Sequence, residues 1–170
     1  HNGFSGGVQF GIGIRGTTQA DQSGSNGFES DNDASGSSNK PFTSAIFANI
    51  SIIGAKGQAA TSISTQFQNG AQIRRNSNLK IYNTFITGYP NGVYIDSQKG
   101  NAKALAASGA IDLQNVVLAG VDGWGTNGWG QGFASNPKGF AVSDAEQNAA
   151  LTPIMIGTVT PTDWFKSLNG

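Results

Sequence analysis

The sequence predicts an all-β chain whose short strands run parallel and stack as a solenoid. A ten-residue pattern occurs three times, its apolar positions alternate as in strands, and segments that favour helix are scarce. The pattern occupies residues 45–54, 79–88 and 111–120. Its central asparagines lie 34 and 32 residues apart, at Asn49, Asn83 and Asn115. A period of this length is typical of architectures in which each repeat stacks on the next.

Within each repeat, the alternation of apolar residues shifts by one position at the asparagine. Apolar residues lie four and two positions before it and one and three positions after it, with Thr84 as the exception. Period-two alternation indicates a strand on each side. In a straight strand the shift would turn the second half inside out. Because asparagine adopts the left-handed backbone region more readily than most residues, we expect a sharp bend there.

Stacking these bent units would pair every strand in parallel with its equivalent in the next repeat. The three asparagines would then form a column of hydrogen-bonded amides, with a column of core residues beneath it: Ile52, Ile86 and Leu118. The repeat resembles the right-handed parallel β-helix of the pectate-lyase-like superfamily, which has an asparagine ladder at one corner. This resemblance covers residues 45–120 and implies an architecture more than an activity. An antiparallel sandwich, which also joins short strands by glycine turns, remains the alternative.

Other segments extend this pattern. Residues 7–16 alternate as an earlier strand, and residues 71–76 and 92–96 are candidates for strands on a third side of each repeat. The alanine-rich stretch at 101–110 predicts one or two helical turns.

Two helices are expected near the C-terminus. Ser143 and Glu146 form a capping box at the start of residues 143–153, and Pro153 would stop that helix. Residues 160–170 repeat this pattern, with threonine, proline and glycine at the positions that begin and end a helix. Such helices would cap one open end of the solenoid.

Composition excludes several classes of protein. The net charge is zero, which argues against general attraction to nucleic acid or anionic membranes. Cysteine is absent and the single histidine is His1, so disulfides, thiolate metal sites and a Ser-His-Asp site are not expected. No apolar run approaches the roughly 20 residues that span a membrane. Because the chain begins at His1, we expect a single domain, 1–170, that is a fragment or the C-terminal part of a longer chain.

The acidic segment 28–41 suggests a calcium site. Oxygen-bearing side chains alternate from Asp31, and Gly36 follows at the position of a turn, as at the start of a calcium loop. Phe42 stands where an EF-hand needs its closing glutamate, so the segment is not an EF-hand. Calcium could still be held by backbone carbonyls together with three carboxylates: Glu29, Asp31 and Asp33. The alternative is a solvated loop whose side chains make Asx turns.

The same region carries a second resemblance. "GFESDNDASGS" (27–37) followed by "FTSAIFANISIIG" (42–54) is similar to segments of large secreted β-helical proteins of Bacteroidota, of the kind exported by type IX secretion. The resemblance implies a secreted or bacterial cell-surface location, with outer-membrane proteins as possible partners. It implies no defined reaction.

A glycine-rich loop at 120–133 contains Trp124 and Trp129. Their indole faces could stack on sugar rings, which predicts a glycan-binding site. The alternative is that both indoles fold back and cover the core.

Arg74 and Arg75 are the candidates for a catalytic base. Pectate-lyase relatives abstract a proton with a basic residue beside calcium-binding carboxylates on the outer face. Strand alternation sends one arginine outward and one inward, and the nearest carboxylates expected by repeat are Asp96 and Asp112. This is a thin set, so we interpret both arginines as surface or structural residues and assign no catalytic residue.

Two classes of function remain. The first is a secreted or cell-surface protein with a non-catalytic binding, adhesion or accessory role in an outer-membrane surface complex, whose partners are polysaccharides or surface proteins. The second is a polysaccharide lyase or hydrolase. An outward face with three or more acids and an arginine or lysine in one groove would favour the enzyme, whereas a flat, acid-poor face would favour the binding protein. The sequence favours the binding protein, with weak, salt-insensitive glycan binding.

Overall fold

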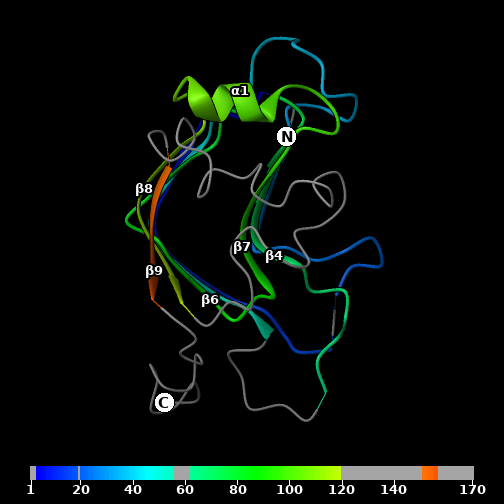
Figure 1. Ribbon diagram of the computed structural model, residues 1–170, viewed down its shortest axis with the longest axis vertical. Coiled ribbons are helices and arrows are strands. Elements are labelled where there is room, and N and C mark those ends of the chain that lie inside the picture. The colour runs from blue at the N-terminus through cyan, green and yellow to red at the C-terminus, as the bar shows by residue number, and fades with distance from the viewer. Residues whose placement is uncertain (1–2, 19, 56–61, 120–150, 157–170) are drawn as a thin grey trace.

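A computed structural model describes residues 3–18, 20–55, 62–119 and 151–156 (Figure 1). Within these residues lie nine strands and one short helix. The strands are β1 (Gly7–Ile14), β2 (Phe28–Ser30), β3 (Ile46–Ile53), β4 (Asn69–Arg74), β5 (Lys80–Tyr82), β6 (Phe85–Thr87), β7 (Asn91–Asp96), β8 (Asp112–Ala119) and β9 (Leu151–Ile156), and the helix is α1 (Ala102–Ala107). The expected strands at 7–16, 71–76 and 92–96 and the helical turns at 101–110 are therefore confirmed.

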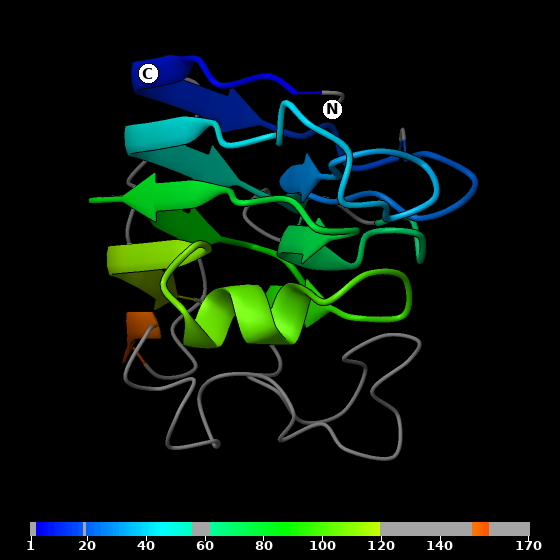
Figure 2. The same cartoon turned by 90° about the horizontal axis from the view of Figure 1, so that it is seen from above.

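The strands form two sheets in which every pairing is parallel. The larger sheet has the order β1-β3-β5-β8-β6, with β9 also paired to β8, and the smaller sheet has the order β2-β4-β7. β5 and β6 are the two halves of one repeat, and both pair with β3 on one side and β8 on the other. Figure 2 shows the strands as successive layers. Parallel pairing throughout excludes the antiparallel sandwich among the described strands.

The bends lie at the repeated asparagines. Asn49, Asn83 and Asn115 have φ values of 57°, 47° and 54°, in the left-handed region. The strand registers place the three residues opposite one another. Asn115 Nδ2 donates to Asn83 Oδ1 at 3.1 Å. The shift in alternation therefore corresponds to a real change of chain direction at each of these residues.

The core follows the alternating pattern on both sides of each bend. Ile86 and Leu118 are fully buried and Ile52 nearly so. Thr84, the polar exception in the pattern, is also buried, and its hydroxyl donates to the carbonyl of Tyr82 at 2.8 Å. That hydrogen bond satisfies the hydroxyl and explains why threonine is tolerated at a core position.

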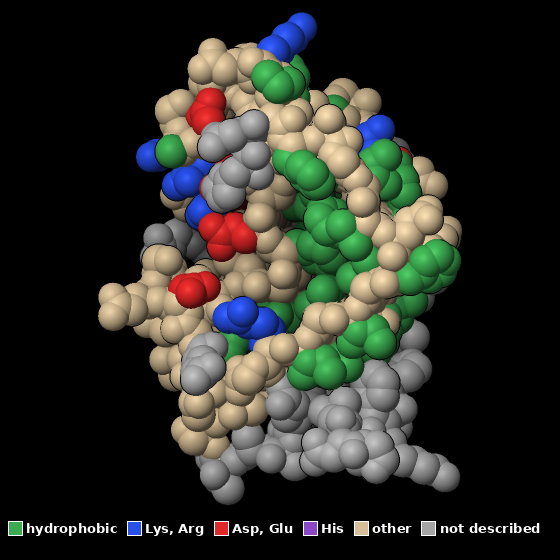
Figure 3. All heavy atoms as spheres, turned by 180° about the vertical axis from the view of Figure 1, so that it is seen from behind, with side chains coloured by type: hydrophobic (Ala, Val, Ile, Leu, Met, Phe, Trp, Pro, Cys, Tyr) green, Lys and Arg blue, Asp and Glu red, His purple; other side chains and the backbone are tan. Residues whose placement is uncertain are grey.

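The first strand is built differently from the others. Phe10, with φ of 59°, stands at the bend of this strand. The inward positions after it are Gly11 and Gly13, which lie against Ile50 and Ile52. Its large apolar residues are exposed, and Phe10 is 80% exposed. Figure 3, which views the molecule from the side of β1, shows hydrophobic side chains gathered there, with acidic and basic side chains grouped beside them. The alternation in 7–16 correctly predicted a strand, although its apolar residues do not all face the core.

The predicted helix at 143–153 is wrong at its C-terminal end. Residues Leu151–Ile156 form β9, which pairs in parallel with β8. Pro153 lies within this strand, opposite Val116. β-Branched residues favour strand, and β9 has a partner only on one side among the described strands, where a missing N–H is tolerated. Residues 143–150 and the predicted helix at 160–170 lie outside the described residues. No described helix is both long and apolar enough to cross a membrane.

Candidate functional site

The smaller sheet contains a second repeat that the sequence analysis missed. Its three strands begin at or just after the same dipeptide in "NGFESD" (26–31), "NGAQIR" (69–74) and "NGVYID" (91–96). The strands pair in register, so equivalent positions lie side by side. Alternate positions point to the core and carry mainly apolar residues, whereas those between them point outward and carry polar ones. The recurring Asn-Gly was the signal that could have revealed this repeat.

The asparagines of this repeat form a second, buried column. Asn69 Nδ2 donates to Asn26 Oδ1 at 2.8 Å, and Asn91 Nδ2 donates to Asn69 Oδ1 at 3.3 Å. Asn69 and Asn91 are 1% and 3% exposed. The glycine after the first asparagine is required by close packing, because a Cβ on Gly27 would lie 2.4 Å from the carbonyl oxygen of Gly70. The column fixes the start of all three strands.

The outward face of this sheet holds a cluster of acids and arginines. Arg74 Nε donates to Asp31 Oδ1 at 2.6 Å, and Arg75 donates to Asp31 Oδ2 at 3.1 Å. Arg74 also forms an ion pair of 2.5 Å with Glu29. The Asp31 side chain is only 1% exposed, so two arginines compensate one buried carboxylate. Both arginines point to the same acid because Arg75, with φ of 51°, breaks the strand alternation that would send one arginine outward and the other inward.

A chain of amide hydrogen bonds links this cluster to a third acid. Asn26 Nδ2 is within 3.1 Å of both Glu29 Oε2 and Gln72 Oε1. Gln72 Nε2 donates to Asp96 Oδ2 at 3.1 Å, and the backbone N–H of Gln98 donates to Asp96 Oδ1 at 2.8 Å. The outward side chains of β2, β4 and β7 therefore form one continuous network.

Two ionisable groups on this face, Arg74 and Tyr94, have raised pKa values and keep their protons. Burial acts to lower the pKa of Arg74, but the hydrogen bond to Asp31 and the charges of Asp31, Glu29 and Asp96 together outweigh it and raise that pKa. Burial, together with the negative charge of Asp96, raises the pKa of Tyr94 well above its usual range. Arg74 is therefore a permanent cation and the Tyr94 hydroxyl a hydrogen-bond donor.

A pocket of about 140 Å³ opens on this network. Half of its eight lining residues carry polar side chains that are almost completely buried: Asn69, Gln72, Tyr94 and Asp96. The hydrogen bonds described above hold Asn69, Gln72 and Asp96 in place. Arg74 and the exposed Gln98 complete the central part of the lining. A pocket with these walls can donate to and accept from several ligand hydroxyls at once.

The three carboxylates predicted to bind calcium do not share one partner. Glu29 and Asp31 face Arg74. Asp33 turns to its own loop, where one of its oxygens accepts from the backbone N–H and the hydroxyl of Ser35, at 2.9 and 2.8 Å, and Ser37 donates to both oxygens. No group of three or more potential metal-binding side chains occurs within the part of the chain that is described. Calcium binding stays a prediction.

The remaining candidate residues are distributed elsewhere. Trp124 and Trp129 lie outside the described residues. Asp96 lies on the same face as Arg74, but Asp112 lies on the larger sheet and accepts from the Tyr82 hydroxyl at 2.8 Å. Of the two acids proposed as companions of Arg74, the structure thus brings only Asp96 near it.

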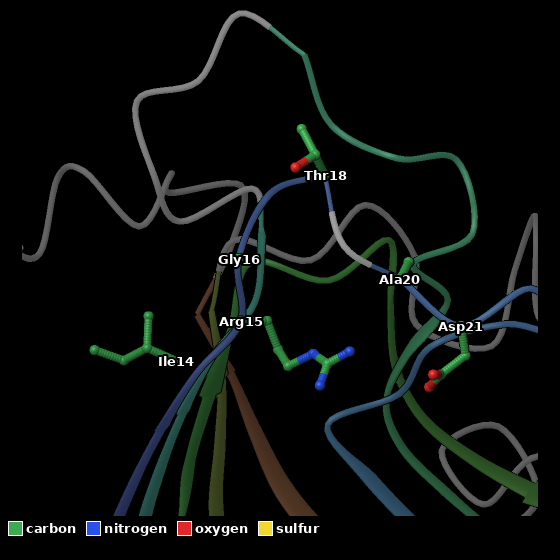
Figure 4. Close-up of a pocket in the computed structure, with 6 residues that line it drawn as sticks. All are labelled: Ile14, Arg15, Gly16, Thr18, Ala20 and Asp21. Atoms are coloured by element: carbon green, nitrogen blue, oxygen red, sulfur yellow. The ribbon is translucent and has the colours of Figure 1, made fainter.

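A second, larger pocket of about 430 Å³ lies in the loop that follows β1 (Figure 4). Arg15 points toward the segment carrying Ala20 and Asp21, and its guanidinium donates to Ser25 at 2.7 Å while lying 5.9 Å from the ring centre of Phe67. Half of the residues that line this pocket are polar or charged: Arg15, Thr18 and Asp21. The smaller pocket is the better candidate because a continuous hydrogen-bond network fixes its lining.

Parallel strands bent at stacked asparagines, with a polar network on one outer face, define this chain as a parallel β-helix protein. A family model described as pectate-lyase like beta helix domain matches residues 1–128. The chain belongs to this family. Searches of curated proteins and of solved structures return no match.

Proposed function

We propose that this domain is a non-catalytic polysaccharide-binding module, and that the pocket on the outer face of the smaller sheet holds a sugar unit. The observation that carries the proposal is the state of the lining. Gln72, Tyr94 and Asp96 are 7%, 2% and 6% exposed, yet all three reach an open pocket. Polar groups fixed before the ligand arrives lose little conformational entropy on binding, which favours recognition of a hydroxyl-rich molecule.

The charge arrangement supports binding over catalysis. Three acids and an arginine do share this outer face, which is the observation that favours the alternative, a polysaccharide lyase or hydrolase. Asp31 and Glu29, however, are engaged by arginine. The pKa of Arg74 is raised, so this residue is poorly suited to accept a proton. Asp96 is the carboxylate in the pocket lining, and it accepts from the Gln72 amide and the Gln98 backbone N–H.

We further propose a secreted or cell-surface location. The basis is the resemblance of residues 27–37 and 42–54 to secreted β-helical proteins of Bacteroidota exported by type IX secretion. Surface or outer-membrane proteins are the corresponding partners. Trp124 and Trp129 are proposed as additional sugar contacts through their indole faces.

The test is affinity electrophoresis of the parent protein against a panel of polysaccharides. At least one polymer should retard the parent, and Gln98→Ala should weaken that retardation because Gln98 is exposed and lines the pocket. Gln114→Ala is the matched control, since Gln114 is an exposed glutamine on the larger sheet. If Gln98→Ala, Gln114→Ala and the parent are retarded equally, the polysaccharide binds at a different site on the protein. The Trp124→Ala/Trp129→Ala variant then tests the tryptophan loop.

The same mixtures separate binding from catalysis. Each retarding polymer is incubated with the protein and assayed for new reducing ends and for unsaturated products. A non-catalytic module leaves the polymer unchanged. Turnover that Asp96→Asn abolishes would establish the enzyme alternative.

Calcium binding through Glu29, Asp31 and Asp33 is tested separately by thermal unfolding with EDTA and with millimolar calcium. An ion bound only by the folded state stabilises it by about 2.7 kcal/mol at a hundredfold excess over its dissociation constant. Identical midpoints in the two conditions would mean that the acidic segment is an ordinary loop.

A further inference from the structure

We infer that the pocket on the smaller sheet selects uncharged glycans and rejects polymers of uronic acid. The inference rests on the proposed function and names its substrate class. It follows from where the charges on this face lie and from which of them a ligand can reach.

The five charged side chains of the network on the outer face carry an excess of negative charge. Three acids, Glu29, Asp31 and Asp96, oppose two bases, Arg74 and Arg75, which gives a formal sum of −1. Of these five groups, only Arg74 and Asp96 line the pocket. An entering carboxylate therefore meets one cation and one anion directly, with the remaining acids behind that cation.

The cation is already engaged. Arg74 directs its Nε to Asp31 and its Nη2 to both Asp31 and Glu29. A uronate that took either position would leave Asp31, which is fully buried, with less compensation for its charge. An uncompensated buried carboxylate is strongly unfavourable, so the exchange does not favour the ligand.

The other lining groups suit hydroxyls. Gln72, Gln98 and Asn69 present neutral amides, and Tyr94 presents a protonated hydroxyl. Asp96 can accept from a sugar hydroxyl, but its negative charge repels a sugar carboxylate. Every one of these groups can thus serve an uncharged sugar, and none except Arg74 offers a positive charge to an acidic one.

The experiment compares polymers of different charge by affinity electrophoresis at low salt and at 150 mM salt. The uncharged polymers are galactomannan, mixed-linkage β-glucan and hydroxyethylcellulose, and the anionic polymer is polygalacturonate, which carries a carboxylate on every sugar. We expect the best uncharged polymer to bind at least about tenfold more tightly than polygalacturonate at low salt, equivalent to about 1.4 kcal/mol. The difference should narrow at high salt because repulsion is screened.

Charge-neutralising variants sharpen the test. Asp96→Asn should raise affinity for polygalacturonate toward that for the uncharged polymer, whereas Asp112→Asn, on the larger sheet, should leave the ratio unchanged. Should Asp96→Asn fail to fold, Glu29→Gln removes one negative charge at an exposed position and should act in the same direction.

The outcomes distinguish this inference from the function on which it rests. Equal or tighter binding of polygalacturonate by the parent overturns the charge selection and leaves polysaccharide binding intact. The charge selection is also overturned if neither Asp96→Asn nor Glu29→Gln changes the ratio of the affinities for the uncharged polymer and for polygalacturonate. Failure of the parent to bind any polymer overturns the proposed function and the inference together.

Discussion

The two sheets each contain a column of asparagines, and the two columns serve different purposes. In the larger sheet, Asn49, Asn83 and Asn115 have positive φ, and the last two are exposed. In the smaller sheet, Asn69 and Asn91 are buried, and neither is among the residues with positive φ. The first column is defined by backbone conformation and the second by hydrogen bonding away from water.

The difference shows that the same residue type can recur at equivalent positions of two sheets for two different physical reasons. At a bend, asparagine is used because it tolerates the left-handed region, and glycine would tolerate it equally well. In the buried column, asparagine is used because its amide both donates and accepts, and glycine cannot replace it. Replacement by glycine and by alanine therefore separates the two roles.

The largest effect is expected at the centre of the buried column. Asn69→Ala removes the donor to Asn26 and the acceptor of Asn91. Asn26 Oδ1 still accepts from the Asn69 backbone N–H at 3.1 Å, but two side-chain hydrogen bonds of a nearly buried residue are lost, so we expect the free energy of unfolding to fall by about 2–3 kcal/mol. Urea denaturation measures this change.

Asn69→Gly should be no more stable than Asn69→Ala, since the position has no need of glycine's conformational freedom. Asn115→Ala is the control from the exposed column and should cost clearly less. A glycine variant that restored stability would show that the buried column is also a conformational feature.

The bends provide the second comparison. Asn83→Ala places a residue with a Cβ at a φ of 47° and also removes the acceptor for Asn115. The left-handed conformation costs a non-glycine residue about 1–2 kcal/mol, and an exposed hydrogen bond adds little. We expect a loss of about 1–3 kcal/mol for alanine and a smaller loss for Asn83→Gly, measured by the same denaturation. If Asn83→Gly is less stable than Asn83→Ala, the asparagines of the larger sheet are needed for their amide hydrogen bonds rather than for their backbone conformation.

Sequence reasoning found the first column and missed the second for physical reasons. The bends at Asn49, Asn83 and Asn115 leave a shift in apolar alternation, and their spacing is nearly constant. The asparagines of the smaller sheet are 43 and 22 residues apart, at Asn26, Asn69 and Asn91, because loops of unequal length separate their strands. Without a constant period, only the short Asn-Gly dipeptide marks them.

The candidate site shows the same limit. Arg74 and Asp31 are separated by 43 positions, and their contact depends on the register between β2 and β4, which no local pattern encodes. The acidic segment is unusual in sequence, but its local pattern does not indicate that Asp31 pairs with Arg74 while Asp33 accepts from Ser35. At β9, the capping box at Ser143 indicated a helix extending to Pro153, but pairing with β8 takes precedence over that local signal at residues 151–153.

The smallest effect extends the comparison of buried and exposed hydrogen bonding to Asp33. Hydrogen bonds from the Ser37 hydroxyl first, and then from the Ser37 backbone and from Ser35, hold the pKa of Asp33 well below its usual value of 3.8. A carboxyl whose pKa is lower in the folded state than in the unfolded state stabilises the fold above the unfolded pKa, and this contribution is lost as pH falls through the folded pKa.

Asp33→Asn imitates the protonated carboxyl. Its melting temperature should lie slightly below that of the parent at pH 6, and the gap should shrink as pH falls below about 4. Asp21→Asn, which changes an exposed acid before β2, is the control for the loss of one charge. A gap that stays constant from pH 6 to the lowest pH at which the parent folds, or one matched by Asp21→Asn, would mean that the serine hydrogen bonds shape the loop without favouring the ionised carboxylate.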